Sequence, residues 1–154
     1  MASIGTGGPI EFLLPGSGDD YLDVANTYLL VRARMTKANG DNIDPNTAVG
    51  PVNNWMHSLF SQVDVTLNGT LVTPSTNTYP YRAYIETLLS HGAEAKQTQL
   101  TSCLWFKDTA GHMDATDDAN AGLRERKGYT ADGRVVDMMG RLHVDLFFFR
   151  IDIS

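Results

Sequence analysis

An Asn-Gly pair between two alternating runs is the feature that most constrains the fold of this chain. Apolar and polar residues alternate over residues 61–68, and a period of two with β-branched residues predicts a strand with one buried face. Asn68 and Gly69 then form the preferred pair for a hairpin turn in which both central residues have positive φ. Residues 70–73 read as the returning strand, which Pro74 ends because proline has no N–H to donate to a ladder.

A helix is predicted directly after this hairpin, over residues 81–90. Asn77 or Thr78 is expected to cap its start, Pro80 suits its first turn, and Gly92 is expected to supply a left-handed stop. Its apolar residues recur at spacings of three and four and predict one buried stripe, namely Tyr81, Tyr84, Ile85, Leu88 and Leu89. The hairpin and helix both need covering partners, so we expect the flanking segments to supply them.

Those flanking segments read mostly as strands. Residues 9–14, 28–36 and 141–153 alternate, and residues 135–139 are a weaker candidate. In the second of these runs one face is predicted to carry Leu29, Val31, Ala33 and Met35. Helical spacing or composition appears over residues 53–60 and 93–101, and residues 103–106 are either a short strand or a buried segment.

Separated strands with long loops predict a mainly β fold, an antiparallel jelly-roll β-sandwich with one or two inserted helices. A parallel α/β fold needs a helix after most strands, and only one strand here is convincingly followed by one. Residues 1–8 are predicted to be a flexible leader, and residues 9–154 a single domain, which is large enough to bury a core.

Charge and cysteine content exclude several classes of function. The formal net charge of −6 disfavours a general nucleic-acid groove or an anionic membrane surface, since both need clustered Lys and Arg. Cys103 is the single cysteine, which rules out an internal disulfide and favours a reducing compartment. No signal peptide is visible at the start, and the longest strongly apolar run, residues 146–149, is too short to span a bilayer.

Short motifs predict no catalytic, cofactor-binding or metal-binding residue, and we expect no enzymatic activity. The run of residues 16–18 (Gly-Ser-Gly) favours a turn over a phosphate loop, because two aspartates follow it and no Lys-Ser/Thr does. His112 and Asp114 lie in an acidic run without EF-hand spacing, which favours a solvated loop. Cys103 lies among apolar neighbours and is expected to pack as a small hydrophobe.

Other ionisable residues also favour structural roles. His57, His91 and His143 occur singly, without the paired pattern of a metal-binding cupin. The basic cluster, which is interrupted by Glu125, is predicted to be a solvated surface element or an inter-subunit salt-bridge site; it contains Arg124, Arg126 and Lys127.

Three long runs carry a resemblance to a known family. They are GPIEFLLPGSGDDYLDVANTYLLVRARM, VGPVNNWMHSLFSQVDVTLNGTLVTPSTNTYPYRAYIETLLSHG and LTSCLWFKDTAGHMD. Over residues 8–145 the chain resembles the N-terminal part of the major capsid proteins of Polinton (Maverick) elements and adintoviruses. Copies of such genes also occur integrated in animal genomes.

The resemblance implies a structural role. Capsid subunits of that family have two jelly rolls, and three of them form a pseudo-hexagonal trimeric capsomer of an icosahedral double-stranded DNA virus shell. The chain would be the first jelly roll of such a subunit or a fragment of one, and its partners would be copies of itself and neighbouring capsid subunits. No cofactor, small-molecule substrate, sequence-specific nucleic acid or membrane span is implied. Its place would be the virion capsid, assembled in the host nucleus or cytoplasm and not secreted.

The end of the chain departs from the family pattern. Residues 147–154 stop where the family continues into a second jelly roll. We therefore expect apolar surface left for a missing partner, at Phe147 and Phe149 and over residues 55–60.

Two other classes stay open. A jelly-roll binding module for a sugar or protein ligand would use converging aromatic side chains, and the loosely suitable ones are Tyr79, Tyr81 and Tyr129. A small metal enzyme would require His112 and Asp114 to meet another histidine in space.

Overall fold

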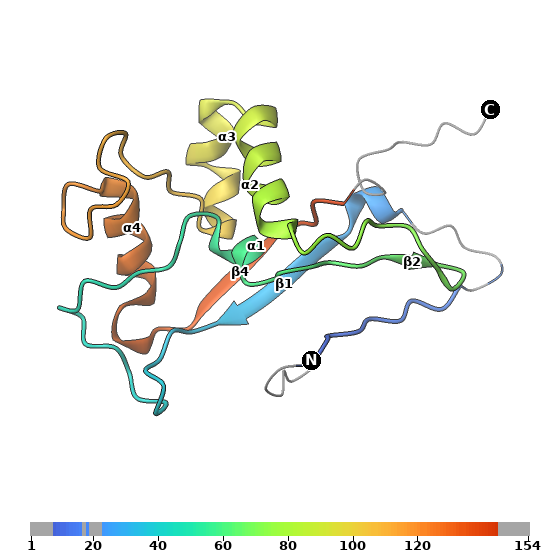
Figure 1. Ribbon diagram of the computed structural model, residues 1–154, viewed down its shortest axis with the longest axis horizontal. Coiled ribbons are helices and arrows are strands. Elements are labelled where there is room, and N and C mark those ends of the chain that lie inside the picture. Colours follow the sequence, from blue (N-terminus) through green and yellow to red (C-terminus); the bar gives the residue numbers. More distant parts are fainter. Residues whose placement is uncertain (1–7, 17, 19–22, 145–154) are drawn as a thin grey trace.

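The computed structural model describes residues 8–16, 18 and 23–144 of the chain. Its centre is a two-stranded antiparallel sheet in which β1 (Tyr28–Ala33) pairs with β4 (Val136–Arg141). A second, much smaller sheet is the hairpin of β2 (Thr66–Leu67) and β3 (Thr70–Leu71). Short helices lie on one side of the β1–β4 sheet (Figure 1).

The helices supply most of the regular structure between the two central strands. α1 enters the core, α2 and α3 stand beside each other above it, and α4 lies at the end of the sheet where β4 begins (Figure 1). In chain order the helical elements are η1 (Val24–Asn26), α1 (Trp55–Ser58), α2 (Tyr79–Ser90), α3 (Ala93–Gln97), η2 (Gln99–Cys103), α4 (Ala121–Thr130) and η3 (Ala131–Gly133).

The prediction of an antiparallel jelly-roll sandwich is wrong. The described residues form a mixed α/β arrangement with two separate two-stranded sheets, and no second sheet packs across the first. A sandwich needs two sheets whose inner faces interdigitate. Here α1 and η2 cover the inner face of β1 and β4 instead, so the core lies between a sheet and helices.

Several predicted strands also lack the partner that a strand requires. Residues 9–14 are extended but pair with no other strand in the part of the chain that the structure describes. The predicted strand over residues 141–153 is wrong where it can be assessed, since β4 ends at Arg141 and residues 142–144 are irregular. Residues 145–153, including Phe147 and Phe149, lie outside the described residues, as do residues 1–7 of the predicted leader.

The alternation in β1 correctly predicted its two faces. Leu29, Val31 and Ala33 lie half-buried against the core, whereas Leu30 and Arg32 are exposed. In the register of the sheet, the exposed residues of β1 pair with exposed residues of β4, and the half-buried residues of β1 pair with buried residues of β4. The inner face is therefore apolar and the outer face is open to solvent.

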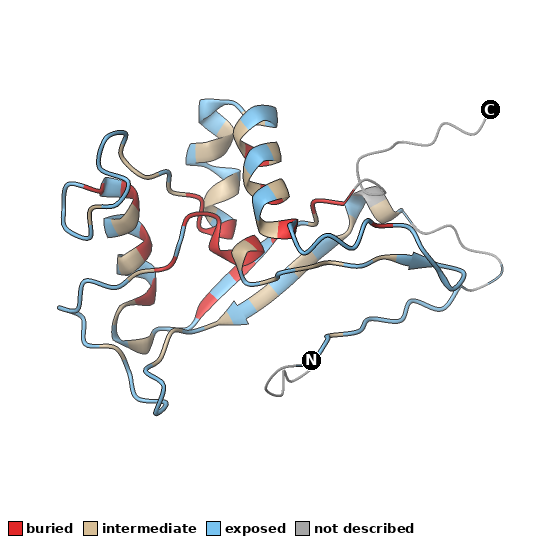
Figure 2. Cartoon of the chain, in the orientation of Figure 1, coloured by how far each residue is buried: buried red, intermediate tan, exposed pale blue. Residues whose placement is uncertain are grey.

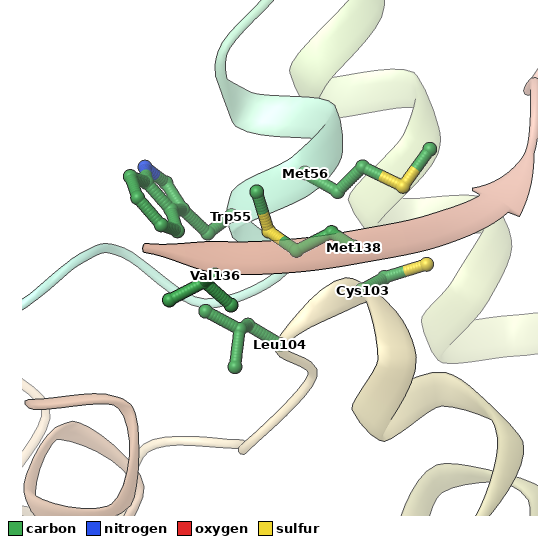
Figure 3. Close-up of a cluster of buried hydrophobic side chains, with 6 residues drawn as sticks. All are labelled: Trp55, Met56, Cys103, Leu104, Val136 and Met138. Carbon is green, nitrogen blue, oxygen red and sulfur yellow. The ribbon is translucent and has the colours of Figure 1, made fainter. Parts of the chain in front are cut away.

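The core is a compact cluster of side chains from three separate parts of the chain (Figure 3). α1 contributes Trp55 and Met56, η2 and the residue after it contribute Cys103 and Leu104, and β4 contributes its inner face. The six buried members are Trp55, Met56, Cys103, Leu104, Val136 and Met138. Residues 55–60 were predicted to form exposed apolar surface, and this is wrong for the two residues at the centre of the core.

The turn of the β2–β3 hairpin confirms the prediction from Asn-Gly. Asn68 has φ 49° and Gly69 has φ 78°, so both central residues are left-handed. The ladder is shorter than predicted, with two residues in each strand and one further bond from the Val72 amide to the Val65 carbonyl. Leu67 is exposed, so the predicted buried face is absent at the turn.

The helix predicted over residues 81–90 is confirmed as α2, but the face it buries is not the predicted one. Its buried residues are Tyr79, Ala83 and Thr87, which recur every four positions. The predicted stripe instead points outward in large part, and Leu89 is 79% exposed. Ala83 and Thr87 are small, and α2 lies in contact with α1.

The predicted ends of α2 are only partly right. Thr78 is the N-cap residue and Pro80 lies in the first turn, but the Thr78 side chain does not cap a helix amide. Gly92 is not a left-handed stop: it has φ −72° and ψ 176° and precedes α3. The helical predictions over residues 53–60 and 93–101 are confirmed by α1 and by α3 with η2.

Two left-handed residues join α1 to the segment after η2. Asn54 has φ 58° and Leu104 has φ 57°, a conformation that non-glycine residues rarely adopt. The side-chain oxygen of Asn53 accepts hydrogen bonds from the amides of Asn54 (2.9 Å) and Phe106 (2.7 Å). The Asn54 amide also donates to the Leu104 carbonyl at 3.2 Å. Residues 103–106 are therefore a buried irregular segment, the second of the two predicted possibilities.

Candidate functional site

A buried polar cluster lies where α1, α2 and the segment after β4 meet. Nδ1 of His57 lies 3.0 Å from the Tyr79 hydroxyl, and the backbone amide of His143 donates to that hydroxyl oxygen at 3.4 Å. The Tyr79 oxygen accepts from His143, so its own proton is free for Nδ1 of His57. Nδ1 of His143 lies 2.9 Å from Oε2 of Glu86, and the two imidazole rings meet edge to face at 4.7 Å.

Burial disfavours the protonated form of both histidines of this cluster. Loss of hydration lowers the pKa of His57 to about 3, and the neighbouring His143 lowers it further. Burial also lowers the pKa of His143, although the hydrogen bond to Glu86 opposes this shift. For Tyr79, burial raises the pKa to about 12, so the hydroxyl stays protonated as a donor. A general base with so low a pKa is poorly matched to catalysis near neutral pH.

Cys103 packs beside this cluster rather than acting as an activated nucleophile. Its Sγ donates to the Met139 carbonyl at 3.3 Å, next to a bond from Ser102 Oγ to the same oxygen at 2.8 Å. Burial raises the pKa of the Cys103 thiol, whereas a reactive thiolate requires a lowered pKa. A Cβ added at Gly140 would overlap Cys103 Sγ, so the glycine is what lets β4 lie against η2.

Arg126 corrects the prediction of a solvated basic cluster. Its side chain is only 3% exposed and lies on the inner side of α4. Nε donates to the Pro51 carbonyl at 2.8 Å, Nη1 to the Phe106 carbonyl, and Nη2 to Asp108 at 2.7 Å. Arg124 is exposed as predicted. One arginine thus ties α4 to two distant loops.

The remaining predicted candidates do not come together. His112 and Asp114 are exposed in the loop before α4, and no three His, Cys, Asp or Glu side chains among the described residues gather in a way that could hold a metal ion. Tyr79 is buried, Tyr81 is exposed on α2, and Tyr129 lies on α4 stacked with Phe106 at 5.5 Å. The structure therefore forms no shared aromatic surface from these three tyrosines. Of the Gly-Ser-Gly run, the structure describes residues 16 and 18, and both are exposed.

An open depression of about 450 Å³ lies beside the start of β4. Its lining brings together no nucleophile with a base and contains neither a histidine nor a cysteine. The lining residues are Thr101, Ser102, Leu104, Tyr129, Arg134, Val135, Val136 and Asp137.

The outer face of the β1–β4 sheet is the clearest candidate interaction surface. It consists of three directly opposed cross-strand pairs: Tyr28 with Arg141, Leu30 with Met139, and Arg32 with Asp137. The central pair is apolar, with Leu30 62% exposed and Met139 49% exposed. We call these six residues the outer sheet face.

Polar contacts border the apolar pair on both sides. Arg32 donates twice to the Asp137 carboxylate, at 2.6 and 2.9 Å, and this lowers the pKa of Asp137. The Arg141 guanidinium lies 5.2 Å from the centre of the Tyr28 ring and donates to its hydroxyl at 3.1 Å. An apolar centre with a polar border is the usual anatomy of a protein interface.

The two edges of this sheet differ. The outer edge of β4 meets η2, whose Ser102 and Cys103 side chains bond the Met139 carbonyl. Within the described ranges, β1 pairs with β4 alone, so its other edge has backbone groups without a strand partner. Close by in sequence, residues 9–14 are extended and mostly exposed, as the pale blue segment in Figure 2 shows. Among the described residues, an apolar segment and a strand edge thus both lack a strand partner in the same chain.

Sequence reasoning missed the buried polar cluster around His57 and the burial of Arg126 against two loops. The histidines at 57 and 143 were read as single residues because nothing local links positions so far apart. The i,i+4 pair of Arg82 and Glu86 (2.6 Å) was readable from spacing, and it marks the helix turn whose carboxylate reaches His143. No local signal distinguished Arg126 from Arg124.

Comparison with known proteins gives one relative to report. An uncharacterized protein of Caenorhabditis elegans is 32% identical over 108 residues, which is 66% of this chain and 26% of that protein. The chain thus spans about a quarter of the relative that it matches. No protein-family model and no solved structure matches the chain. Among the described residues, no helix has the length and apolar character needed to cross a membrane.

Proposed function

We propose that the chain is part of a structural protein of a viral shell, a major capsid protein or a fragment of one, which acts by binding other copies. The observation that carries this proposal is the outer sheet face, where Tyr28, Leu30 and Met139 lie exposed on a sheet of only two strands. A two-stranded sheet is marginal by itself, and exposed apolar patches mark interaction sites. A protein partner that covers this face would stabilise the two-stranded sheet and bury its exposed apolar side chains.

The resemblance to capsid proteins of Polinton elements and adintoviruses supports the kind of partner. In that family, identical subunits form trimers that tile an icosahedral shell, so the partner would be another copy of the chain or a neighbouring capsid subunit. The proposal concerns this assembly role, located in the virion, and does not include the sandwich fold. The similarity to a nematode protein agrees with the occurrence of such genes in animal genomes.

The buried polar cluster supports an assembly role over catalysis. His57 and Cys103 are both buried, and the shifts of their pKa values are opposite to those that would make a base and a nucleophile near neutral pH. The absence of enzymatic activity stays a prediction.

Sedimentation velocity of the full chain over a range of concentrations tests the proposal. We expect concentration-dependent oligomers, which electron microscopy of the same samples would show as discrete or tiled particles. The double variant Leu30→Ser with Met139→Ser should shift the chain toward monomer while its circular dichroism stays unchanged, because neither side chain belongs to the core.

Leu89→Ser is the matched control, since this residue is also apolar and is even more exposed, but it lies on α2. A chain that stays monomeric at every concentration would contradict the proposal. If Leu89→Ser weakens association as much as the double variant does, the outer sheet face is not the binding surface.

A survey of neighbouring genes tests the viral part separately. Genes for a packaging ATPase, a maturation protease and a protein-primed polymerase beside this one would support the capsid role. A neighbourhood of unrelated cellular genes at every locus that encodes the chain would count against it.

A further inference from the structure

We propose that the unpaired edge of β1 binds residues 10–14 of a second copy of this chain, as an added antiparallel strand. This inference rests on the self-association in the proposed function and names the site at which it occurs. Its two halves are the edge and the segment, and within the described residues neither has a strand partner.

The edge of β1 is suited to accept a strand. In an antiparallel pair, every second residue directs its N–H and C=O away from its partner strand. β4 occupies one side of β1, and within the described residues no backbone bond reaches the other side. Such edges are templates for a further strand unless they are covered or charged.

Residues 10–14 are suited to be that strand. Their sequence, Ile-Glu-Phe-Leu-Leu, would place Ile10, Phe12 and Leu14 on one face and Glu11 and Leu13 on the other. It holds no proline, and it is bounded by Pro9 and Pro15, which cannot extend a ladder. Phe12, Leu13 and Leu14 are all exposed, and Leu13 is 89% exposed. Figure 1 shows this part of the chain running separately from β1.

Charge selects one register. If Glu11 lies opposite Arg32, its carboxylate also comes within diagonal reach of Arg34, which has the same face. Arg32 uses Nε and Nη2 for Asp137, so its Nη1 is available for a second carboxylate. A slip by one residue would turn Glu11 toward the core side of the sheet, where a carboxylate is unfavourable.

The same register places the apolar residues of the segment beside apolar residues of β1 on both faces of the sheet. Leu13 falls opposite Leu30 and extends the outer sheet face. Phe12 and Leu14 fall opposite Val31 and Leu29, which are only half-buried at the margin of the core. One added strand would therefore complete the cover of the core and widen the outer face.

The geometry favours a second copy over the same chain. Only the residues between Pro15 and Thr27 would connect the segment to β1 within one chain, and the single chain leaves the segment unpaired. The entry to β1 is itself held in place, since the Asn26 side chain accepts from Arg141 and donates to Asp23. A segment that arrives from another copy is free of this connection.

Disulfide trapping in the full chain tests the pairing. Chains with Leu13→Cys are mixed with chains with Leu30→Cys, since opposed residues in a ladder lie within disulfide range. We expect a covalent dimer from the mixture after mild oxidation. Neither chain should form it when mixed with the unsubstituted chain, because Cys103 is buried.

Sedimentation of a proline variant is the second measurement. Leu13→Pro removes a ladder N–H, because Leu13 lies opposite Leu30, whose backbone groups point to the free edge. The segment makes no contact with the core, so the chain should keep its melting temperature. Its dissociation constant should rise at least about tenfold. Leu89→Ser serves again as the control and should leave the dissociation constant unchanged.

Each other result overturns the inference in a recognisable way. Association that Leu13→Pro does not weaken, with no trapped dimer, leaves the proposed function intact and refutes this site. A monomer at every concentration refutes both. A chain that carries both Leu13→Cys and Leu30→Cys is the last comparison. If a disulfide forms only within this chain and never between two chains, the segment lies on its own β1 edge, and the exchange between copies is refuted.

Discussion

The Tyr79 hydroxyl lies 3.0 Å from Nδ1 of His57, in a buried position where the imidazole can only be accommodated without its second proton. Because burial lowers the pKa of His57 to about 3 in the folded chain, against about 6.5 when unfolded, the unfolded state binds more protons between these values. Stability is therefore fully present above about pH 6.5 and is lost as the pH falls below it.

We predict that the free energy of unfolding falls by about 2 kcal/mol on account of His57 between about pH 7.5 and pH 5. His143, whose pKa burial also lowers, adds to the loss in the same direction. Denaturant unfolding at a series of pH values measures the slope. His57→Gln should flatten it, and His112→Gln, an exposed histidine, should not. An unchanged slope in His57→Gln would show that the protonation of another group is responsible.

Removal of the Arg126 side chain should be among the most damaging single changes in the chain. Arg126→Gln should lower the free energy of unfolding by about 3 kcal/mol or more, because it leaves the carbonyls of Pro51 and Phe106 and the Asp108 carboxylate without their donor. Arg124→Gln, on the exposed side of the same helix, should change it by less than about 0.5 kcal/mol. Equal effects of the two substitutions in urea melts would show that the three hydrogen-bonded contacts of Arg126 do not stabilise the fold.

Gly140 and Cys103 should be energetically coupled. Gly140→Ala should be strongly destabilising by itself, since its Cβ would overlap the Cys103 sulfur. Cys103→Ala removes that sulfur, so the double variant should be more stable than the sum of the single effects predicts, by about 0.5–3 kcal/mol. A double-mutant cycle from thermal or denaturant melts measures this coupling, and strict additivity would contradict the close packing of β4 on η2.

Gly69 in the hairpin turn and Gly92 after α2 should respond differently to substitution. Gly69→Val should destabilise the chain by at least about 1 kcal/mol, because φ at this position is 78° and no surrounding atom would compensate the strain. Gly92 has φ −72° and open space around it, so Gly92→Ala should introduce no backbone strain and should cost less than Gly69→Val. Denaturant midpoints compare the two, and similar values would contradict the left-handed turn.

Local chemistry explains the parts of the fold that could be predicted. The positive φ values of Asn68 and Gly69 follow from the residue types themselves, and the faces of β1 follow from strict alternation. α2 was predictable as a helix because its spacing, its proline and its length agree.

The predictions failed where distant residues decide the outcome. α2 buries Ala83 and Thr87 rather than its leucines, because α1 and the His143 segment offer a polar surface to that face. Arg126 is buried because two carbonyls and Asp108 converge on it, and residues 10–14 are no strand because no neighbour pairs with them in one chain. The resemblance to jelly-roll proteins added strands that these local patterns do not form alone.

The pairing of β1 with β4 has a consequence for how the protein is made. Arg32 and Asp137 face each other across the sheet but are 105 positions apart in the chain. While a ribosome synthesises the intervening residues, which takes roughly 5–20 s at common elongation rates, Leu29 and Val31 have no strand beside them and no complete core above them. The nascent chain therefore carries an apolar strand without its partner until β4 has emerged. We expect it to depend on chaperones that hold such strands during translation, and to aggregate when it is synthesised faster than they can bind it.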